Sequence, residues 1–194
     1  MILYKVLGLD GKPCHGGSGV WSLPTDDNPG DWMPVIKRVV PCQSGYHLCR
    51  KQDLVNWLGE SIYECELDSG VEFVVSDDNK DSSKIVTGGR VRLVRLCSNW
   101  NEFTARMFAV DCAERRLEYF EKYRRGDSRV RDCLATTRRF ANGDATGDEL
   151  SAARSAAESA AWSAARFTAE SAARSAERAW QTDRLIQDVE GVLP

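Results

Sequence analysis

Hydrophobic residues are spaced differently in the two halves of the chain. Up to about residue 97 they form short runs separated by Gly, Pro and charged residues, a pattern that is typical of strands joined by turns. Beyond residue 97 they recur at helical spacing, and Pro is absent until the last residue. This spacing is typical of amphipathic helices. The pattern therefore predicts a β-rich half followed by a helical half.

The first half is expected to form a small sheet. An apolar run at Ile2–Gly8 predicts the opening strand. Residues 11–34 are too rich in Gly and Pro for long elements and are predicted to form a loop pinned by Trp21 and Trp32. Further strands are predicted at 35–40, 45–49, 62–67, 71–76 and 90–96, with a short helix at 50–58.

The second half is expected to be entirely helical. Helices are predicted at 99–124 and 127–142, followed by a longer helical segment at 148–189 that contains neither Gly nor Pro. Asn99 with Glu102, and Thr146 with Glu149, have the spacing of capping boxes at the start of the first and third of these segments.

A four-residue repeat, Ser-Ala-Ala-Arg and its variants, fills residues 151–178. Four residues exceed the 3.6-residue helical turn, so the alanine stripe winds slowly round the helix. The segment is either one long helix or two antiparallel helices with a break near Phe167 and Thr168, where the repeat loses its serine. Its fourth positions carry Arg154, Glu158, Trp162, Arg166, Glu170, Arg174 and Arg178.

This repeat has two interpretations, a solvated helix without a function of its own and a surface on which a partner docks. Trp and Arg are enriched among the residues that dominate protein interfaces. The candidate partner-binding residues are Arg154, Glu158, Trp162, Arg166, Arg174 and Trp180. Of Trp162 and Trp180, one is predicted to anchor the helix and the other to contact a partner. A second copy of the chain is the simplest partner, which predicts a homodimer.

Amino-acid composition changes at the same point as the hydrophobic spacing. Residues 1–97 contain no alanine and 11 of the 15 glycines, whereas residues 98–194 contain all the alanines. Alanine favours helices, and glycine favours turns. The prediction is an α+β fold, in which a small mixed or antiparallel β-rich module, residues 1–97, packs on an all-helical, Ala-rich antiparallel helix bundle, residues 98–194.

Net charge and apolar content exclude several kinds of partner. The formal net charge of −3, from 26 basic and 29 acidic residues, argues against nucleic acid, whose binding proteins concentrate Lys and Arg on one face. No apolar run approaches the roughly 20 residues that span a bilayer. The N-terminus lacks the features of a secretory signal, so a cytoplasmic location and reduced cysteines are expected.

A metal site has one candidate set of ligands, formed by Cys14, His15, Cys42, His47 and Cys49. Thiolates and imidazoles are ligands of zinc, but structural zinc sites show two closely spaced pairs that this chain lacks. Reduced cysteines that pack as small hydrophobic residues are the favoured interpretation. The prediction is therefore no metal and no cofactor.

The second half resembles the alanine-rich helical putative immunity protein family. The residues that carry the resemblance are Ala109-Val110-Asp111-Cys112-Ala113-Glu114-Arg115, then Asp127-Ser128-Arg129, then Phe140-Ala141-Asn142-Gly143 and the repeat. The resemblance covers residues 103–188. It implies a helical protein that binds a protein partner.

The first half resembles a phage and bacterial domain of unknown function. That domain has a Cys-x-x-Gly-aromatic-His-x-Cys core, which here reads Cys42, Gly45, Tyr46, His47 and Cys49. An acidic strand, Tyr63-Glu64-Cys65-Glu66, and the segment Ser83-Lys84-Ile85-Val86 follow in the same order. The resemblance covers residues 2–96 and implies no particular activity.

The order of elements in the first half is also similar to that of ADP-ribosyltransferases, in which a split sheet binds a nicotinamide dinucleotide. Tyr4 stands where those enzymes often have histidine, and His47 stands where they have tyrosine. Under this alternative, His47 and Tyr46 lie near a nucleotide pocket, and Glu64 or Glu66 orients the imidazole of His47. A histidine that is hydrogen-bonded within a sheet is the simpler interpretation.

The leading functional hypothesis is a non-catalytic binding protein. By resemblance it is associated with a phage or mobile element, and it sequesters or inhibits a bacterial protein, either a toxin or a defence effector. The alternative is an ADP-ribosyltransferase-like or nucleotide-binding domain, active or degenerate, in the first half. No P-loop, dinucleotide-binding glycine motif, HExxH or GxSxG motif occurs in the sequence.

Overall fold

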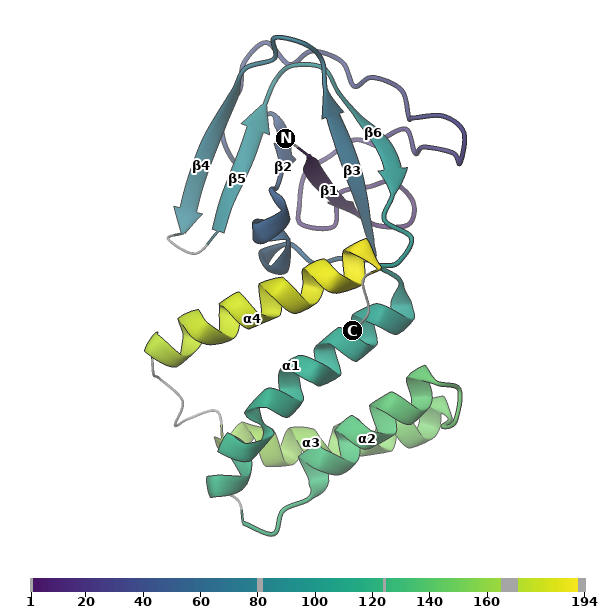
Figure 1. Ribbon diagram of the computed structural model, residues 1–194, viewed down its shortest axis with the longest axis vertical. Helices are drawn as coiled ribbons and strands as arrows, with labels where there is room; N and C mark the ends of the chain where they lie inside the picture. The colour runs from purple at the N-terminus through teal and green to yellow at the C-terminus, as the bar shows by residue number, and fades with distance from the viewer. Residues whose placement is uncertain (1, 80–81, 124, 165–170, 192–194) are drawn as a thin grey trace. The chain divides into compact units, whose positions relative to one another are not determined.

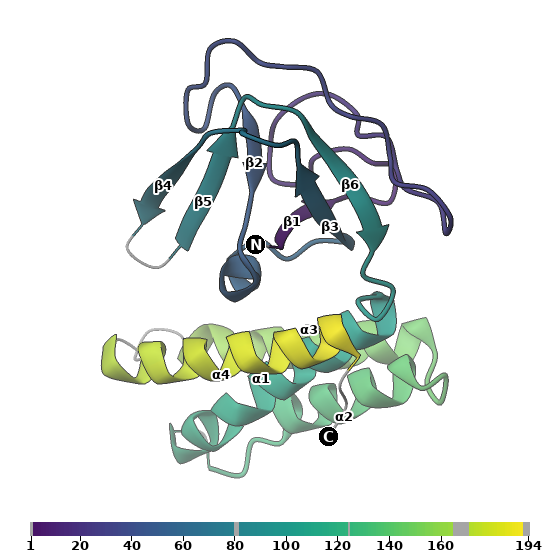
Figure 2. The same ribbon diagram turned by 45° about the horizontal axis from the view of Figure 1, so that its top comes forward.

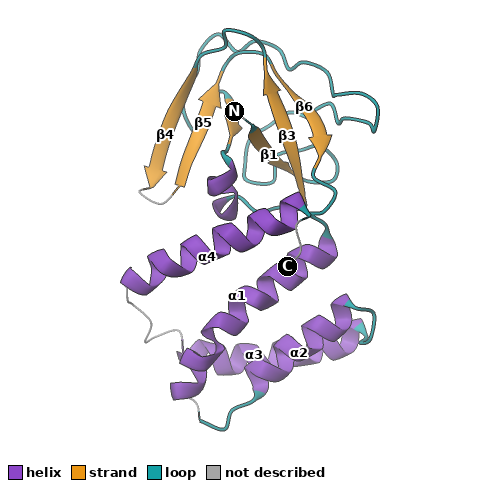
Figure 3. Ribbon diagram, viewed as in Figure 1, coloured by secondary structure: helices purple, strands orange, loops and turns teal. Residues whose placement is uncertain are grey.

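The computed structural model describes residues 2–79, 82–123, 125–164 and 171–191. The chain divides into two compact units, which we call the β unit and the helical unit. The β unit comprises Met1–Asn101 and Thr182–Pro194, and the helical unit comprises Glu102–Gln181. Strands occur in the first part of the chain and α-helices in the second (Figure 3). The predicted α+β fold class is confirmed.

Two three-stranded antiparallel sheets form the framework of the β unit (Figures 1 and 2). One has the order β1–β3–β6 and consists of Leu3–Leu7, Ser61–Leu67 and Val91–Leu96. The other has the order β2–β5–β4 and consists of Tyr46–Leu48, Ser82–Thr87 and Phe73–Asn79. The sheets meet where Tyr4 and Cys49 exchange two backbone hydrogen bonds of 2.9 and 3.0 Å. Strands β1 and β2 therefore lie beside one another.

The core of the β unit is built from alternate positions of these strands. Side chains two residues apart on a strand share a face, so Leu3, Lys5 and Leu7 of β1 point the same way. Leu3 and Leu7 are fully buried in the main apolar cluster. Other members of this cluster are Trp21, Tyr46, Leu48, Tyr63, Cys65, Ile85, Val91 and Leu93. The backbone thus places a lysine on the side of β1 that faces the core.

Three sequence predictions for the β unit need correction. Residues 35–40 form no strand, because the chain bends at Lys37 and Arg38 instead of staying extended. Ile36 N donates to the carbonyl of Gly88, which directly follows β5, at 2.7 Å. Strand β5 was not predicted because four of its six residues are polar, although Ile85 and Val86 are buried. The helix expected at 50–58 is a 3₁₀ helix, η1, at Lys51–Asn56.

Within the described residues, four α-helices follow the strands: α1 at Glu102–Tyr123, α2 at Arg129–Ala141, α3 at Gly147–Ala164 and α4 at Ser171–Glu190. The predicted capping box of α3 is confirmed. Thr146 N donates to Glu149 Oε2 at 2.7 Å, and Glu149 N donates to Thr146 Oγ1 at 3.2 Å. The predicted break near Phe167 and Thr168 lies outside the described residues. Among the described helices, none is long and apolar enough to cross a membrane.

Candidate functional site

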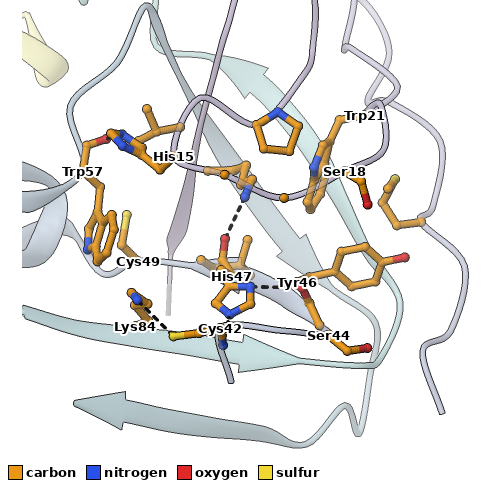
Figure 4. Close-up of a pocket in the computed structure, with 18 of the residues that line it drawn as sticks. His15, Ser18, Trp21, Cys42, Ser44, Tyr46, His47, Cys49, Trp57 and Lys84 are labelled. Atoms are coloured by element: carbon orange, nitrogen blue, oxygen red, sulfur yellow. Dashed lines mark hydrogen bonds between the residues drawn. The ribbon is translucent and has the colours of Figure 1, made fainter. Parts of the chain in front are cut away.

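A cavity of about 440 Å³ lies in the β unit, where β1 and β2 come together (Figure 4). Strand β1 contributes Tyr4, Lys5 and Val6, and the segment that includes β2 contributes residues 42–49. Pro13, His15, Gly16, Gly17, Ser18, Trp21, Met33, Ile36, Trp57 and Lys84 complete the wall. Small-molecule sites in proteins have volumes of ~300–1,000 Å³, so the cavity is large enough for a ligand.

His47 is held by the backbone on both sides of its ring. Cys42 N donates to His47 Nε2 at 2.9 Å, so this nitrogen is an acceptor without a proton. His47 Nδ1 lies 3.1 Å from Gly45 O, which can only accept, so Nδ1 carries the proton. The contacts fix a neutral imidazole in one tautomer. Both ring nitrogens are engaged, as expected for a histidine that organises the loop before β2.

Cys42 presents its thiol at the cavity from a left-handed backbone conformation, with φ at 64°. A non-glycine residue adopts this conformation at an energetic cost, and here it directs the N–H of Cys42 to His47. The Sγ atom lies 3.5 Å from Lys84 Nζ. Lys84 Nζ also lies 4.6 Å from the ring centroid of Trp57, so an ammonium, an indole and a thiol adjoin on one wall (Figure 4).

Lys5 brings a second positive charge to the cavity. Its Nζ donates to His47 O at 3.0 Å and lies 5.4 Å from the ring centroid of Trp21. Burial lowers the pKa of Lys5 from its ordinary value, and nearby thiols oppose this effect. The described residues offer Lys5 no ion pair with a carboxylate.

Aromatic side chains form much of the remaining wall. The rings of Trp21 and Tyr46 meet edge to face, with centroids 5.4 Å apart. Tyr46 donates its hydroxyl to Pro34 O at 2.6 Å, which fixes the ring. His15 Nε2 lies 2.9 Å from Leu58 O and 3.1 Å from Trp57 O, so Nε2 carries a proton and donates to them.

The predicted carboxylates Glu64 and Glu66 do not line the cavity. Glu64 lies on β3 and forms a two-bond ion pair with Arg95 of β6, with distances of 2.6 and 2.7 Å. Glu66 also pairs with an arginine of β6, because its Oε2 accepts from Arg92 Nε at 2.8 Å and lies 2.7 Å from Arg92 Nη2. The structure therefore brings His47 and Tyr46 to the cavity, while it pairs the two carboxylates with arginines across the β3–β6 ladder.

The candidate set of metal ligands is not assembled as a cluster. Among the described residues, no three His, Cys, Asp or Glu side chains are placed to hold one metal ion. Cys14 and Cys42 are exposed, whereas Cys49 is buried with its Sγ 3.6 Å from Tyr4 O. Cys49, Cys65 and Cys97 are buried, as expected for cysteines that pack as small hydrophobic residues.

The predicted partner-binding residues lie on α3 and α4 or between them. Arg154 is exposed on α3, and Trp180 of α4 is half-buried. The side chains of Glu158, Trp162 and Arg174, and all of Arg166, lie outside the described part of the chain.

Sequence reasoning missed a set of contacts that join three helices of the helical unit. Asp111 and Glu114 of α1 accept hydrogen bonds from Arg138 of α2 at 2.7 and 2.6 Å. Arg115 donates to Glu177 of α4 at 3.2 Å, and its guanidinium lies 4.1 Å from the ring centroid of Trp180. The signal was present in the sequence, because the stretch Asp111–Arg115 carries three of these charges.

Lys5 and Lys84 were also missed as site residues. The signal for Lys5 was its position between Leu3 and Leu7, on the apolar face of a predicted strand. Nothing in the sequence alone places Lys84 near Cys42, because β5 was not predicted.

Residues 95–187 match a family model described as Imm-5 like putative immunity protein. No curated protein and no solved structure gives a significant match to the chain. The family match agrees with the resemblance predicted for the second half, and it includes the contacts made by Asp111, Glu114 and Arg115. The resemblance of the first half to a phage and bacterial domain stays a prediction.

Proposed function

We propose that the protein is a non-catalytic inhibitor that binds a bacterial protein, either a toxin or a defence effector, through its helical unit. The observation that carries this proposal is the match of residues 95–187 to the immunity protein family. We place its action in the bacterial cytoplasm and its origin in a phage or other mobile element.

The contacts within the helical unit support a preorganised binding surface. Arg138 joins α2 to α1, and Arg115 joins α4 to α1. A surface that is already ordered loses less conformational entropy on binding than a mobile one. Arg154, exposed on α3, is available to an acidic partner without disturbing these contacts.

The proposed contact surface consists of five fourth positions of the repeat and of Trp180, which lies two residues beyond the repeat. It comprises Arg154, Glu158, Trp162, Arg166, Arg174 and Trp180. Arginine and tryptophan contribute most to binding when they are enclosed by a partner. Trp180 is already stacked by Arg115, so we assign it the anchoring role and assign partner contact to Trp162.

Affinity capture with the tagged full-length chain from bacterial lysates tests this proposal, followed by growth assays with the captured protein. We expect one stoichiometric partner whose expression alone stops growth and whose co-expression with this chain restores it. Arg154→Glu should weaken capture and rescue. Arg116→Glu, the same change at an exposed position of α1, should affect neither and serves as the matched control.

Two outcomes would contradict the proposal: a captured protein that is harmless to growth, and rescue that is equally lost with Arg116→Glu and Arg154→Glu. A second copy of the chain is the remaining proposed partner. Light scattering of the wild type and of Trp162→Ala tests the homodimer. A monomeric wild type, or a dimer indifferent to Trp162→Ala, would remove Trp162 from a self-interface.

A further inference from the structure

The charge of the cavity in the β unit is opposite in sign to that of the whole chain. Lys5 from β1 and Lys84 from β5 both line it, together with His15 and His47. No Asp or Glu occurs among its lining residues within the described part of the chain, although the chain carries a net charge of −3. A cavity lined by one sign of charge concentrates ions of the opposite sign, so the expected ligand is an anion.

The wall is also rich in aromatic rings. Trp21, Tyr46 and Trp57 line the cavity, and two of them are fixed by their own contacts. Tyr46 is held by its hydrogen bond to Pro34 O and by its edge-to-face contact with Trp21. Fixed aromatic side chains provide stacking surfaces for a planar ring, and such stacking tolerates different bases. The ligand is therefore expected to carry a ring as well as a negative charge.

We propose that this cavity binds a mononucleotide-sized ligand, with its phosphate near Lys5 and Lys84 and its planar ring against the aromatic wall. Lysine binds phosphate as a compact point charge, and the volume of about 440 Å³ suits a small molecule. The proposal is independent of the protein-binding role of the helical unit, because every lining residue belongs to the β unit.

Lys5 would gain both hydrogen-bond acceptors and an opposite charge from such a ligand. One of its three N–H donors is used by His47 O. Its burial makes the positive charge unfavourable in the absence of an opposite charge nearby. A phosphate at the cavity supplies the missing opposite charge and acceptors for the other donors. Lys84, at 3.5 Å from Cys42 Sγ, places the second positive charge beside an accessible thiol.

Calorimetry with 5′-AMP, GMP, CMP and UMP tests the proposal on the full chain. Adenosine supplies the ring without the phosphate, and inorganic phosphate supplies the charge without the ring. We expect at least one nucleotide to bind with a Kd below about 1 mM, more tightly than adenosine and phosphate, and more weakly as ionic strength rises. Equal binding of adenosine and AMP, or no binding by any of the four nucleotides, would overturn the proposal.

Substitutions of the cavity lysines test where the phosphate of the nucleotide binds. Lys84→Met should weaken binding of the selected nucleotide by about 10-fold or more, because a hydrogen bond to a charged group is lost. Lys5→Met should do the same, and it should fold because it replaces a half-buried ammonium by an apolar side chain of similar length. Lys12→Met removes an exposed lysine outside the cavity and should leave binding unchanged. Wild-type affinity in both cavity variants would refute the phosphate site.

Two exposed cysteines supply a test of position. Cys42 lines the cavity, whereas Cys14 does not. A saturating nucleotide should slow the alkylation of Cys42 by iodoacetamide and leave that of Cys14 unchanged, as measured by mass spectrometry of the two peptides. If the nucleotide binds but both cysteines keep their original rates, the ligand lies elsewhere and the assignment to this cavity is wrong.

Discussion

Arg138 of α2 donates a hydrogen bond of 2.7 Å to Asp111 of α1. The same guanidinium binds Glu114, one turn further along α1, at 2.6 Å. Arg138 and Asp111 are largely shielded from solvent, with side-chain exposures of 32% and 20%. Two carboxylates on α1 thus share one cation on α2, and this contact orients the two helices.

We expect Arg138→Met to lower the free energy of unfolding of the helical unit by roughly 1–2 kcal/mol. The reason is that two carboxylates lose their shared cation while one of them stays largely shielded. Urea unfolding followed by circular dichroism at 222 nm measures the change.

Arg131→Met is the matched control for this change. Arg131 also lies on α2 and binds a glutamate of α1, Glu121, at 2.6 Å, but its side chain is 62% exposed. Exposed ion pairs contribute ~0.2–1 kcal/mol, so the loss should be smaller. Equal losses for the two variants would show that the shielding of Asp111 is unimportant.

Sequence patterns specify the local elements of this protein better than they specify its pairings. The capping box of Thr146 and Glu149 needs only two residues three positions apart, so the sequence predicts it correctly. Strand β5 fails as a sequence prediction because its residues are mostly polar and it also pairs with β2, which is far away in the sequence. The run at 35–40 fails for the converse reason, since its residue types favour a strand but the chain bends at Lys37 and Arg38.

In the candidate site too, local motifs can be predicted from the sequence, whereas long-range pairings cannot. Tyr46 and His47 could be selected from their local motif, and both line the cavity. The lysines that give the cavity its charge come from β1 and β5, and only the tertiary fold brings them together. Glu64 and Glu66 were plausible partners for His47 by residue type, but the pairing of β3 with β6 places an arginine opposite each of them.

Trp180→Ala should lower the stability of the helical unit by about 1–2 kcal/mol, because Arg115 loses the ring on which it stacks. Trp180→Phe keeps an aromatic face and should lose less. Thermal unfolding of both variants, followed at 222 nm, makes the comparison. If Trp180→Ala melts like the wild type, Trp180 is not an anchor, and partner contact is then its proposed role.

Thr146→Ala should destabilise the start of α3 by about 1 kcal/mol, since Glu149 N loses its acceptor. Ser151→Ala, at an exposed position in the same helix, is the control and should have little effect. The hydrogen bonds from Thr146, together with Arg139, lower the pKa of Glu149. The stabilisation that ionised Glu149 gives to the cap is therefore present above the ordinary pKa of a glutamate. It is lost as the pH falls through the lowered pKa of Glu149. Amide hydrogen exchange of the first turn of α3 measures both effects.

The buried thiols predict that the β unit loses stability at alkaline pH. Burial raises the pKa of Cys49 to about 12, and it also raises the pKa values of Cys65 and Cys97. An acid whose pKa is raised in the folded state contributes stability below its unfolded pKa and loses it as the pH rises toward the folded value. For Cys49 this window runs from about 8.5 to about 12. Lys5, whose pKa is lowered by burial, acts in the opposite sense and offsets part of the loss.

Within that pH window, each fully buried thiol lowers the free energy of unfolding by about 1.4 kcal/mol for every pH unit. Cys49 and Cys65 together should therefore reduce the free energy of unfolding by roughly 3 kcal/mol between pH 8.5 and pH 10, before the offset from Lys5. Urea titrations followed by tryptophan fluorescence at pH 7.5, 8.5 and 10 measure this slope. The double variant Cys49→Ala/Cys65→Ala should start from a lower stability, because it leaves small cavities, but it should show a flatter dependence on pH. Parallel pH profiles for the double variant and the wild type would show that the thiols titrate alike in the folded and unfolded chains, and the argument from burial would fail.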